Sequence, residues 1–339
     1  MVTTAMIEES RSEERSKKAA GFKPTLAAIF EAQRVLAGYF PATPLVRAGG
    51  ISRPGADAYL KLEAQLPTGS FKPRGALFAL SNALRTCKIS EVTASSTGNH
   101  GAAVAWAAKT LGVPATIFLP ANPNPVKRKK IADLGARIVE AGGADLTHAF
   151  VEASAYSSKT GAYFLNDATD RDLPAGPATI GLEILAQLPT VAAVYVPMGD
   201  TALVRGIGAA IKPTHAHVKI IGVQAERAPS YYLSWKEGKP VEVGVGDTCA
   251  DGLATKTVIP QNVRAIREVV DDVQLVTEEQ MLKAIRLLYE CENVLAEPAG
   301  AAATAAFLEE EAPRGPVVLL VSGANISAAA RARAGLPAA

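Results

Sequence analysis

The chain has 339 residues, a formal net charge of +2, and 48% hydrophobic but only 6% aromatic residues. This length suits one large or two modest domains around an aliphatic core. The near balance of charge argues against a dedicated nucleic-acid-binding or membrane-surface protein, and no apolar run reaches the ~20 residues that span a bilayer.

The N-terminal residues and the cysteines bear on where the protein resides. Residues 1–20 mix acidic and basic side chains, unlike a signal peptide or an acid-poor transit peptide, and are expected to form a disordered arm. Cys87, Cys249 and Cys291 are widely spaced and form no CxxC pair. We therefore expect a reduced, cytoplasmic protein.

Strands and helices alternate along most of the chain, which predicts βαβ units and parallel sheets. Four short strands between residues 92 and 165 suit a compact small domain, and a second series follows. In chain order we expect a helix at 24–38, a strand at 59–62, a helix after 71, a strand at 92–95, a helix to 111, a strand at 115–119, a helix at 125–134, a strand at 137–140, a helix at 145–158, a strand at 162–165, a helix at 178–188, a strand at 191–196, a helix at 201–211, a strand at 218–223, an irregular stretch at 227–262, helices at 277–291 and 298–309, and a strand at 317–321.

Lys72 stands between Phe71 and a proline, after a turn rich in glycine and hydroxyl groups and before an apolar-periodic helix. A lysine at such a junction can carry a carbonyl cofactor as a Schiff base. Desolvation by Phe71 would favour the neutral amine that this chemistry needs. The alternative is a solvated surface lysine that begins a helix.

The segment from Lys61 to Ala76 (KLEAQLPTGSFKPRGA) resembles the Schiff-base segment of fold type II pyridoxal-phosphate (PLP) enzymes, the tryptophan-synthase-β type, and within them the serine/threonine dehydratase and serine racemase branch. The resemblance runs from about Ile29 to Ser327. It implies PLP on Lys72, two parallel-sheet αβα domains with the cofactor in the cleft between them, and a homodimer. The large PLP-binding domain would comprise residues 21–90 and 166–339, and the small inserted domain residues 91–165.

The turn from Ser96 to Gly101 lies between a predicted strand and helix, where backbone amides form a natural anion site. An ordinary helix N-cap by Thr97 or Asn99 is the alternative. The resemblance implies that this turn binds the substrate carboxylate, that Asn99 bonds the cofactor's ring hydroxyl, and that His148 faces the substrate side chain. The alternative for His148 is an ordinary surface histidine. The expected substrate contacts are Ser70, Ser96, Thr97, Gly98, Asn99, His100 and His148.

The segment from Pro197 to Leu203 (PMGDTAL) occupies the place of the family's glycine-rich phosphate loop, but only Gly199 remains of the glycine run. Asp200 puts a carboxylate where a phosphate dianion is expected, whereas Thr201 could donate a hydroxyl group. Ser322 matches the family's partner for the pyridine nitrogen. The expected cofactor contacts are Phe71, Lys72, Asn99, Gly199, Asp200, Thr201, Ala202, Leu203, Glu297 and Ser322.

The resemblance implies an ammonia-lyase that eliminates water from a β-hydroxy-L-amino acid such as threonine, serine or a 3-hydroxy analogue. Lys72 would remove the Cα proton, and the cofactor phosphate would protonate the departing hydroxyl group, as in the family. The alternatives are a β-replacement synthase of the cysteine- or threonine-synthase kind, an amino-acid racemase, and a non-catalytic binding protein. Glu226 matches a cation ligand of some relatives, but Tyr232 replaces the second acid, so we expect no tight metal site.

Overall fold

The computed structural model describes residues 22–96, 98–121, 123, 125–143, 146–309 and 314–338. The predicted arm at 1–20 and Thr97 lie outside these ranges. No helix within them combines the length and the apolar character needed to cross a membrane.

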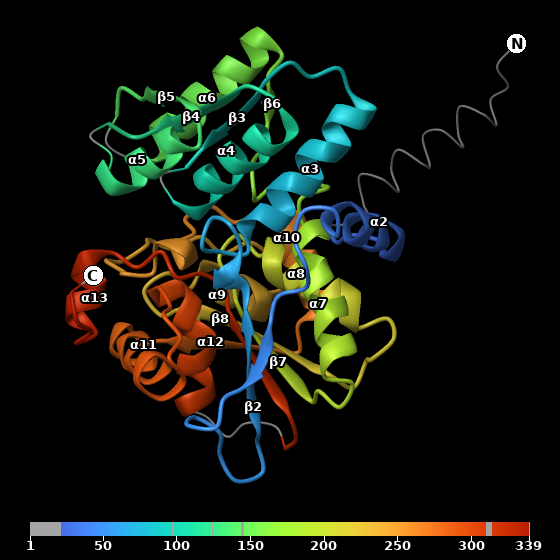
Figure 1. The fold of residues 1–339 in the computed structure, drawn as a ribbon, viewed down its shortest axis with the longest axis vertical. Coiled ribbons are helices and arrows are strands. Elements are labelled where there is room, and N and C mark those ends of the chain that lie inside the picture. Colours follow the sequence, from blue (N-terminus) through green and yellow to red (C-terminus); the bar gives the residue numbers. More distant parts are fainter. Residues whose placement is uncertain are drawn as a thin grey trace, which may run out of the picture.

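The larger sheet has six strands in the order β1-β2-β10-β7-β8-β9. Five strands run parallel, and β1 pairs with β2 in the antiparallel direction. One face packs on α11 and α12, and the other on α7, α8 and α10 (Figure 1). The strands are β1 (Leu45–Arg47), β2 (Ala58–Leu62), β7 (Ala193–Pro197), β8 (Lys219–Ala225), β9 (Asp272–Val276) and β10 (Val317–Val321).

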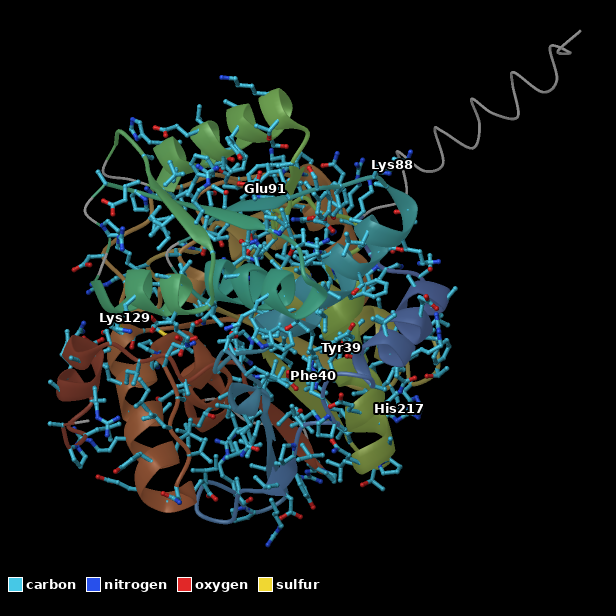
Figure 2. The ribbon with its side chains drawn as sticks, turned by 45° about the horizontal axis from the view of Figure 1, so that its top comes forward. Tyr39, Phe40, Lys88, Glu91, Lys129 and His217 are labelled. Carbon is cyan, nitrogen blue, oxygen red and sulfur yellow. The ribbon has the colours of Figure 1, made fainter. Side chains whose placement is uncertain are left out.

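The smaller sheet has four parallel strands in the order β5-β4-β3-β6. Its apolar side chains pack on α3 and α4 on one side and on α6 on the other (Figure 1). Phe40, labelled in Figure 2, joins this core, and its ring centroid lies 6.3 Å from that of Trp106 on α4. The strands are β3 (Val92–Ser95), β4 (Ala115–Leu119), β5 (Arg137–Glu140) and β6 (Tyr163–Phe164).

The helices connect the strands as the βαβ pattern requires. Helix α3 contacts α4 beside the small sheet and α7 beside the large one. The helices are α2 (Leu26–Leu36), α3 (Lys72–Thr86), α4 (Asn99–Leu111), α5 (Pro125–Asp133), α6 (Leu146–Thr160), α7 (Ala175–Gln187), α8 (Ala202–Ile211), α9 (Ser230–Glu237), α10 (Pro260–Val269), α11 (Glu278–Glu292), α12 (Pro298–Glu309) and α13 (Ala328–Arg333), with short 3₁₀ turns η1 (Glu63–Gln65) and η2 (Asp251–Leu253).

The predicted parallel sheets are confirmed, and the strands at 92–95, 115–119, 137–140 and 317–321 coincide with the observed ones. The expectation of an irregular stretch at 227–262 was wrong in part, because it contains α9, η2 and the start of α10. Its many Gly and Pro residues obscured these helices, although Pro260 stands at the first position of α10, where proline favours helix initiation. The three-residue strand β1, strand β9 and helix α13 were not predicted.

Parallel strands bring their carboxyl ends to one edge of a sheet, where connecting turns can build a site. Four segments start from such ends: the turn into α4 after β3, the chain after β6, the turn into α8 after β7, and the chain after β10. The division of the chain into domains at residues 90 and 166 stays a prediction.

Candidate active site

Lys72 begins α3, and the turn before it is held against the end of β10. The Phe71 amide donates to the Ser322 carbonyl (3.0 Å), and the Ala324 amide donates to the Gly69 carbonyl (2.9 Å). Gly69 has a φ of 72°, a conformation that glycine adopts without steric cost. The backbone therefore brings Lys72 and Ser322 together from opposite ends of the sequence.

The amine of Lys72 faces two carboxyl groups. Nζ lies 2.7 Å from Asp167 Oδ2 and 3.4 Å from Asp200 Oδ2. Burial lowers the pKa of Lys72, but the two carboxyl groups outweigh burial and hold this pKa above its ordinary value. Desolvation thus favours the neutral amine, as expected, but the two carboxyl groups reverse the net effect and keep the amine charged. The Phe71 ring centroid is 5.3 Å from Nζ, close enough for a cation–π contact that also favours the charged form.

The two carboxyl groups differ in charge state. Burial raises the pKa of Asp167, but His100 and Lys72 outweigh it and hold this pKa well below its usual range. Burial also lowers the pKa of His100 itself, although the charge of Asp167 acts to raise it. Burial and the nearby charge of Asp167 raise the pKa of Asp200 to about 7. Asp167 is thus ionised at neutral pH while Asp200 exchanges its proton near pH 7.

Asn99 is fixed by a chain of side-chain hydrogen bonds. Its Nδ2 donates to Glu297 Oε1 (2.6 Å), and its Oδ1 accepts from Asn325 Nδ2 (2.6 Å). Lys130 Nζ on α5 donates to Asn325 Oδ1 (2.5 Å) and to the Thr68 carbonyl (2.8 Å). A Cβ atom on Gly323 would stand 2.3 Å from Glu297 Oε1, so any larger residue there would push Glu297 away from Asn99.

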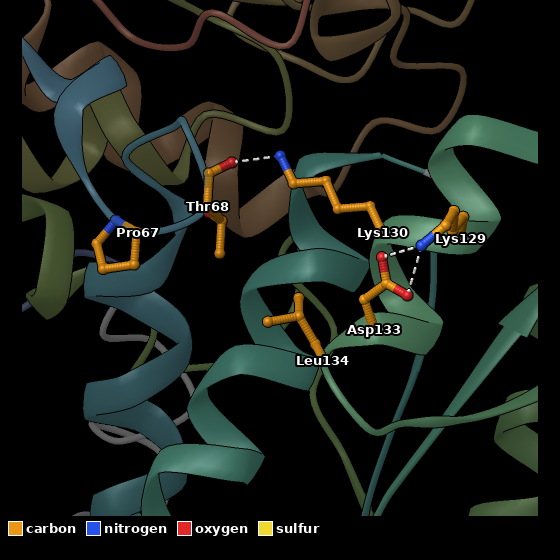
Figure 3. Close-up of a pocket in the computed structure, with 6 residues that line it drawn as sticks. All are labelled: Pro67, Thr68, Lys129, Lys130, Asp133 and Leu134. Carbon is orange, nitrogen blue, oxygen red and sulfur yellow. Dashed lines mark hydrogen bonds and ion pairs between the residues drawn. The ribbon is translucent and has the colours of Figure 1, made fainter.

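A pocket of about 410 Å³ lies beside this chain, between α5 and the turn that precedes Lys72 (Figure 3). Lys72 does not line it. Lys129 Nζ is paired with Asp133 Oδ2 at 2.7 Å, and Lys130 Nζ points toward the Thr68 carbonyl. The pocket therefore separates α5 from the lysine turn without forming part of the Lys72 site. Its lining residues are Pro67, Thr68, Lys129, Lys130, Asp133 and Leu134.

The turn into α8 has the features of an anion cradle. A Cβ atom on Gly199 would stand 2.3 Å from the Gly252 carbonyl oxygen, so the backbone is closely packed there. Thr201 has a φ of 74°, which costs a non-glycine residue about 1–2 kcal/mol. Arg205 is fully buried, and its Nε donates to Thr201 Oγ1 (2.9 Å). This hydrogen bond helps to hold the strained turn.

Arg205 provides the test of whether this turn suits a phosphate group. Its Nη1 donates to the Phe22 carbonyl, but its Nη2 has no hydrogen-bond partner among the described residues. Burial lowers the pKa of Arg205 to about 10, so the guanidinium is still charged at neutral pH. A buried cation with a spare donor, one turn inside a helix N-terminus, matches the charge of a phosphate. The residues present therefore fit the phosphate end of PLP.

The other residues predicted to contact substrate or cofactor are placed as follows. Ser70, whose backbone pairs with Gly323, is buried at the lysine turn. Ser96 Oγ accepts from the Gly98 amide (3.2 Å), and His100 Nε2 lies 2.9 Å from the Leu165 carbonyl oxygen. His148 is exposed on α6 with its ring against Gly143, and its place beside the substrate stays a prediction. Thr97 lies outside the described residues, and Ala202 and Leu203 are buried in the first turn of α8.

Sequence reasoning missed Asp167, Asn325, Lys130 and Arg205. Asp167 follows β6, and its position at the carboxyl end of a predicted parallel strand could have marked it as a site residue. Asn325 belongs to the segment after β10 that resembles the family, but it received no role. Lys130 was not singled out, and nothing in the sequence signals its contact with Thr68. Arg205 carries no recognisable pattern.

Comparisons with known proteins identify the family. The family model described as pyridoxal-phosphate dependent enzyme matches residues 37–323. The L-threonine ammonia-lyase of Geobacter sulfurreducens is 40% identical over 80% of this chain and 68% of its own length. The solved threonine deaminase isoform 2 of Solanum lycopersicum is 30% identical with a TM-score of 0.83, covering 92% of this chain and 90% of that one. The solved maize serine racemase is 28% identical with a TM-score of 0.85, covering 91% of this chain and 95% of that one. With Lys72, Asn99 and Ser322 gathered at one site, this chain belongs to the pyridoxal-phosphate-dependent enzymes of fold type II.

Proposed function

We propose that the protein is a PLP-dependent ammonia-lyase that converts L-threonine or a closely related β-hydroxy-L-amino acid to a 2-oxo acid and ammonia. The observation that carries this proposal is Lys72, which is intact and fixed at the start of α3 between an ion-paired aspartate and the turn into α8. The identity of 40% to an L-threonine ammonia-lyase supports threonine as the first substrate to test.

The cofactor would be held by residues from several elements. Lys72 would bind its aldehyde carbon, and Ser322 and Asn99 would meet its ring. The amides of residues 199–203 and the guanidinium of Arg205 would hold its phosphate. When bound, PLP supplies an electron-withdrawing ring that stabilises negative charge at Cα.

The protein's own groups would perform the proton transfers and the positioning. Lys72 would remove the Cα proton, which requires a neutral amine, so its own proton must first pass to a neighbouring group. The turn from Ser96 to His100 would bind the substrate carboxylate at the N-terminus of α4, a 13-residue helix. The hydrogen bonds from Asn99 to Glu297 and from Asn325 to Asn99 would fix the orientation of Asn99 before substrate arrives.

We also infer a homodimer that works in the cytoplasm, with a small domain at 91–165 inserted into a large one. Among the described residues, the exposed large apolar side chains gather in two stretches, 26–46 and 146–151, and the first of these suits a subunit contact. The three cysteines are free, as is usual in a reducing compartment. Sedimentation of the purified protein would test the dimer.

The function is tested by release of 2-oxo acid from L-threonine, L-serine and L-threo-3-hydroxyaspartate. We expect release from at least one substrate, loss of the activity on removal of PLP, and recovery when PLP is added back. D-serine is measured in the L-serine reaction, because the likeness to a serine racemase makes racemisation the competing activity. Absence of 2-oxo acid, while the cofactor absorption band still shifts with added amino acid, would refute the lyase and favour racemisation or β-replacement.

A further inference from the structure

Asp167 and Asp200 approach the Lys72 amine from two different strand ends. Their Oδ2 atoms lie 2.7 Å and 3.4 Å from the same Nζ atom, so the two carboxyl groups are close neighbours. Two carboxyl groups in such contact ionise one after the other, so the pair holds one proton over a wide pH range. Building on the proposed function, we propose that this pair is the acid of the reaction, with Asp200 donating its proton to the departing β-hydroxyl group.

The contacts distinguish the donor from its partner. Asp167 is the nearer to the Lys72 ammonium and therefore stays ionised, whereas Asp200 is farther away and retains the proton up to a pKa of about 7. The backbone of Asp200 is fixed, because Asn262 Nδ2 donates to its carbonyl oxygen (3.4 Å). The titratable and charged groups around the pair are Lys72 on α3, His100 on α4, Arg205 on α8 and Tyr231 on α9.

A protonated Asp200 also explains how a carboxyl group can occupy a phosphate-binding turn. An ionised Asp200 would repel a phosphate dianion, whereas the neutral acid does not. Bound phosphate would raise the pKa of Asp200 further, because a second negative charge beside it disfavours ionisation. Cofactor binding would thus keep the acid protonated at the pH where the reaction needs it.

The proton balance closes within the contacts observed. The Cα–H bond breaks and its proton passes to the neutral amine of Lys72. The Cβ–O bond breaks with its electron pair on oxygen, and the proton of Asp200 joins that oxygen to form water. The Lys72 ammonium then returns a proton to the carboxyl pair, which its Nζ contacts directly. Base and acid are therefore reset without a proton from solvent.

The test compares two leaving groups in the holoenzyme. L-Serine and L-threonine lose hydroxide and need an acid, whereas β-chloro-L-alanine loses chloride and needs none. We expect the Asp200→Asn variant to release 2-oxo acid from the hydroxy substrates about 10²–10⁴-fold more slowly than the wild type, and from β-chloro-L-alanine within a few-fold of it. Asp200→Glu should restore part of the rate, and Asp57→Asn, which alters an exposed aspartate paired with Arg47, should change neither rate.

Cofactor affinity gives a second measurement that does not depend on turnover. In the wild type, phosphate binds best while Asp200 is protonated, so affinity for PLP should weaken as the pH rises from 6 to 8.5, whereas that of Asp200→Asn should not show this loss. The relative loss should be about tenfold for each unit by which bound phosphate raises the pKa of Asp200. If the Asp200→Asn variant loses the same factor in rate on the hydroxy substrates and on β-chloro-L-alanine, the acid role is overturned and Asp200 is a structural residue. An unchanged rate on the hydroxy substrates, or the same pH dependence of PLP affinity in both proteins, would also overturn it. A wild-type enzyme that releases 2-oxo acid only from β-chloro-L-alanine would refute the proposed dehydration itself, and the acid role with it.

Discussion

The Lys72→Ala variant is expected to release 2-oxo acid from its best substrate about 10⁴-fold more slowly than the wild type, or not at all. The change removes the cofactor's covalent anchor and the base that receives the Cα proton, and both functions reside in the same Nζ atom. The measurement is 2-oxo-acid release under saturating PLP. The absorption band of lysine-bound cofactor should disappear in the same variant.

The matched control for this prediction is Lys72→Arg. A guanidinium keeps a positive charge beside Asp167 and Asp200, so the fold and the ionised state of Asp167 should survive, yet it cannot bind the cofactor covalently. We therefore expect both variants to lack activity, but only Lys72→Ala to alter the pH dependence of thermal stability. A rate above about 1% of wild type in either variant would contradict the role of Lys72 as base and anchor.

The sequence predicts those parts of the fold and site whose signals are local. Gly112, for example, ends α4 with a φ of 70°, as its position after an alanine-rich helix predicts. Lys72 could be recognised because the residues that mark it, Phe71 and Pro73, adjoin it in the chain. Two of the four strands that coincide with prediction, at 115–119 and 317–321, are largely apolar and fully buried, a pattern typical of parallel strands covered on both faces.

The charge state of the site could not be predicted in this way. The acids that hold Lys72 protonated follow it by 95 and 128 residues, and only the fold brings them to its Nζ. The residues adjacent to Lys72 in the chain indicate the desolvation that lowers its pKa, but not the charges of Asp167 and Asp200, which outweigh it.

Disrupting the buried ion-pair network next to Lys72 is expected to have the second large effect, a loss of stability. Arg74 is 1% exposed; its Nε lies 2.8 Å from Glu63 Oε2, and its Nη1 lies 2.6 Å from Glu183 Oε1. Lys61 Nζ binds the same Glu183 at 2.6 Å. This network joins the first turn of α3 to β2, η1 and α7, and so fixes the helix that begins with Lys72.

The Arg74→Met variant should lose about 3–5 kcal/mol of unfolding free energy, because it leaves buried carboxylates without their cation. The midpoint of thermal unfolding, followed by circular dichroism, should fall by roughly 10 °C at pH 7. Arg85→Met is the matched control on the same helix, since Arg85 is 64% exposed and its removal should leave the midpoint nearly unchanged.

The pH dependence separates lost charge pairing from lost packing. Burial raises the pKa of Glu183, but hydrogen bonds and charge from Arg74 and Lys61 outweigh it and hold this pKa below its ordinary value. The pairing therefore stabilises the wild type above the usual pKa of a glutamate and is lost as the pH falls through the lowered value. The difference in midpoint between Arg74→Met and the wild type should accordingly shrink between pH 7 and pH 4, as protonation neutralises the unpaired carboxylates of the variant. An equal difference at both pH values would show that Arg74 stabilises α3 by packing, including its contact 5.6 Å above the Phe40 ring, and not by charge.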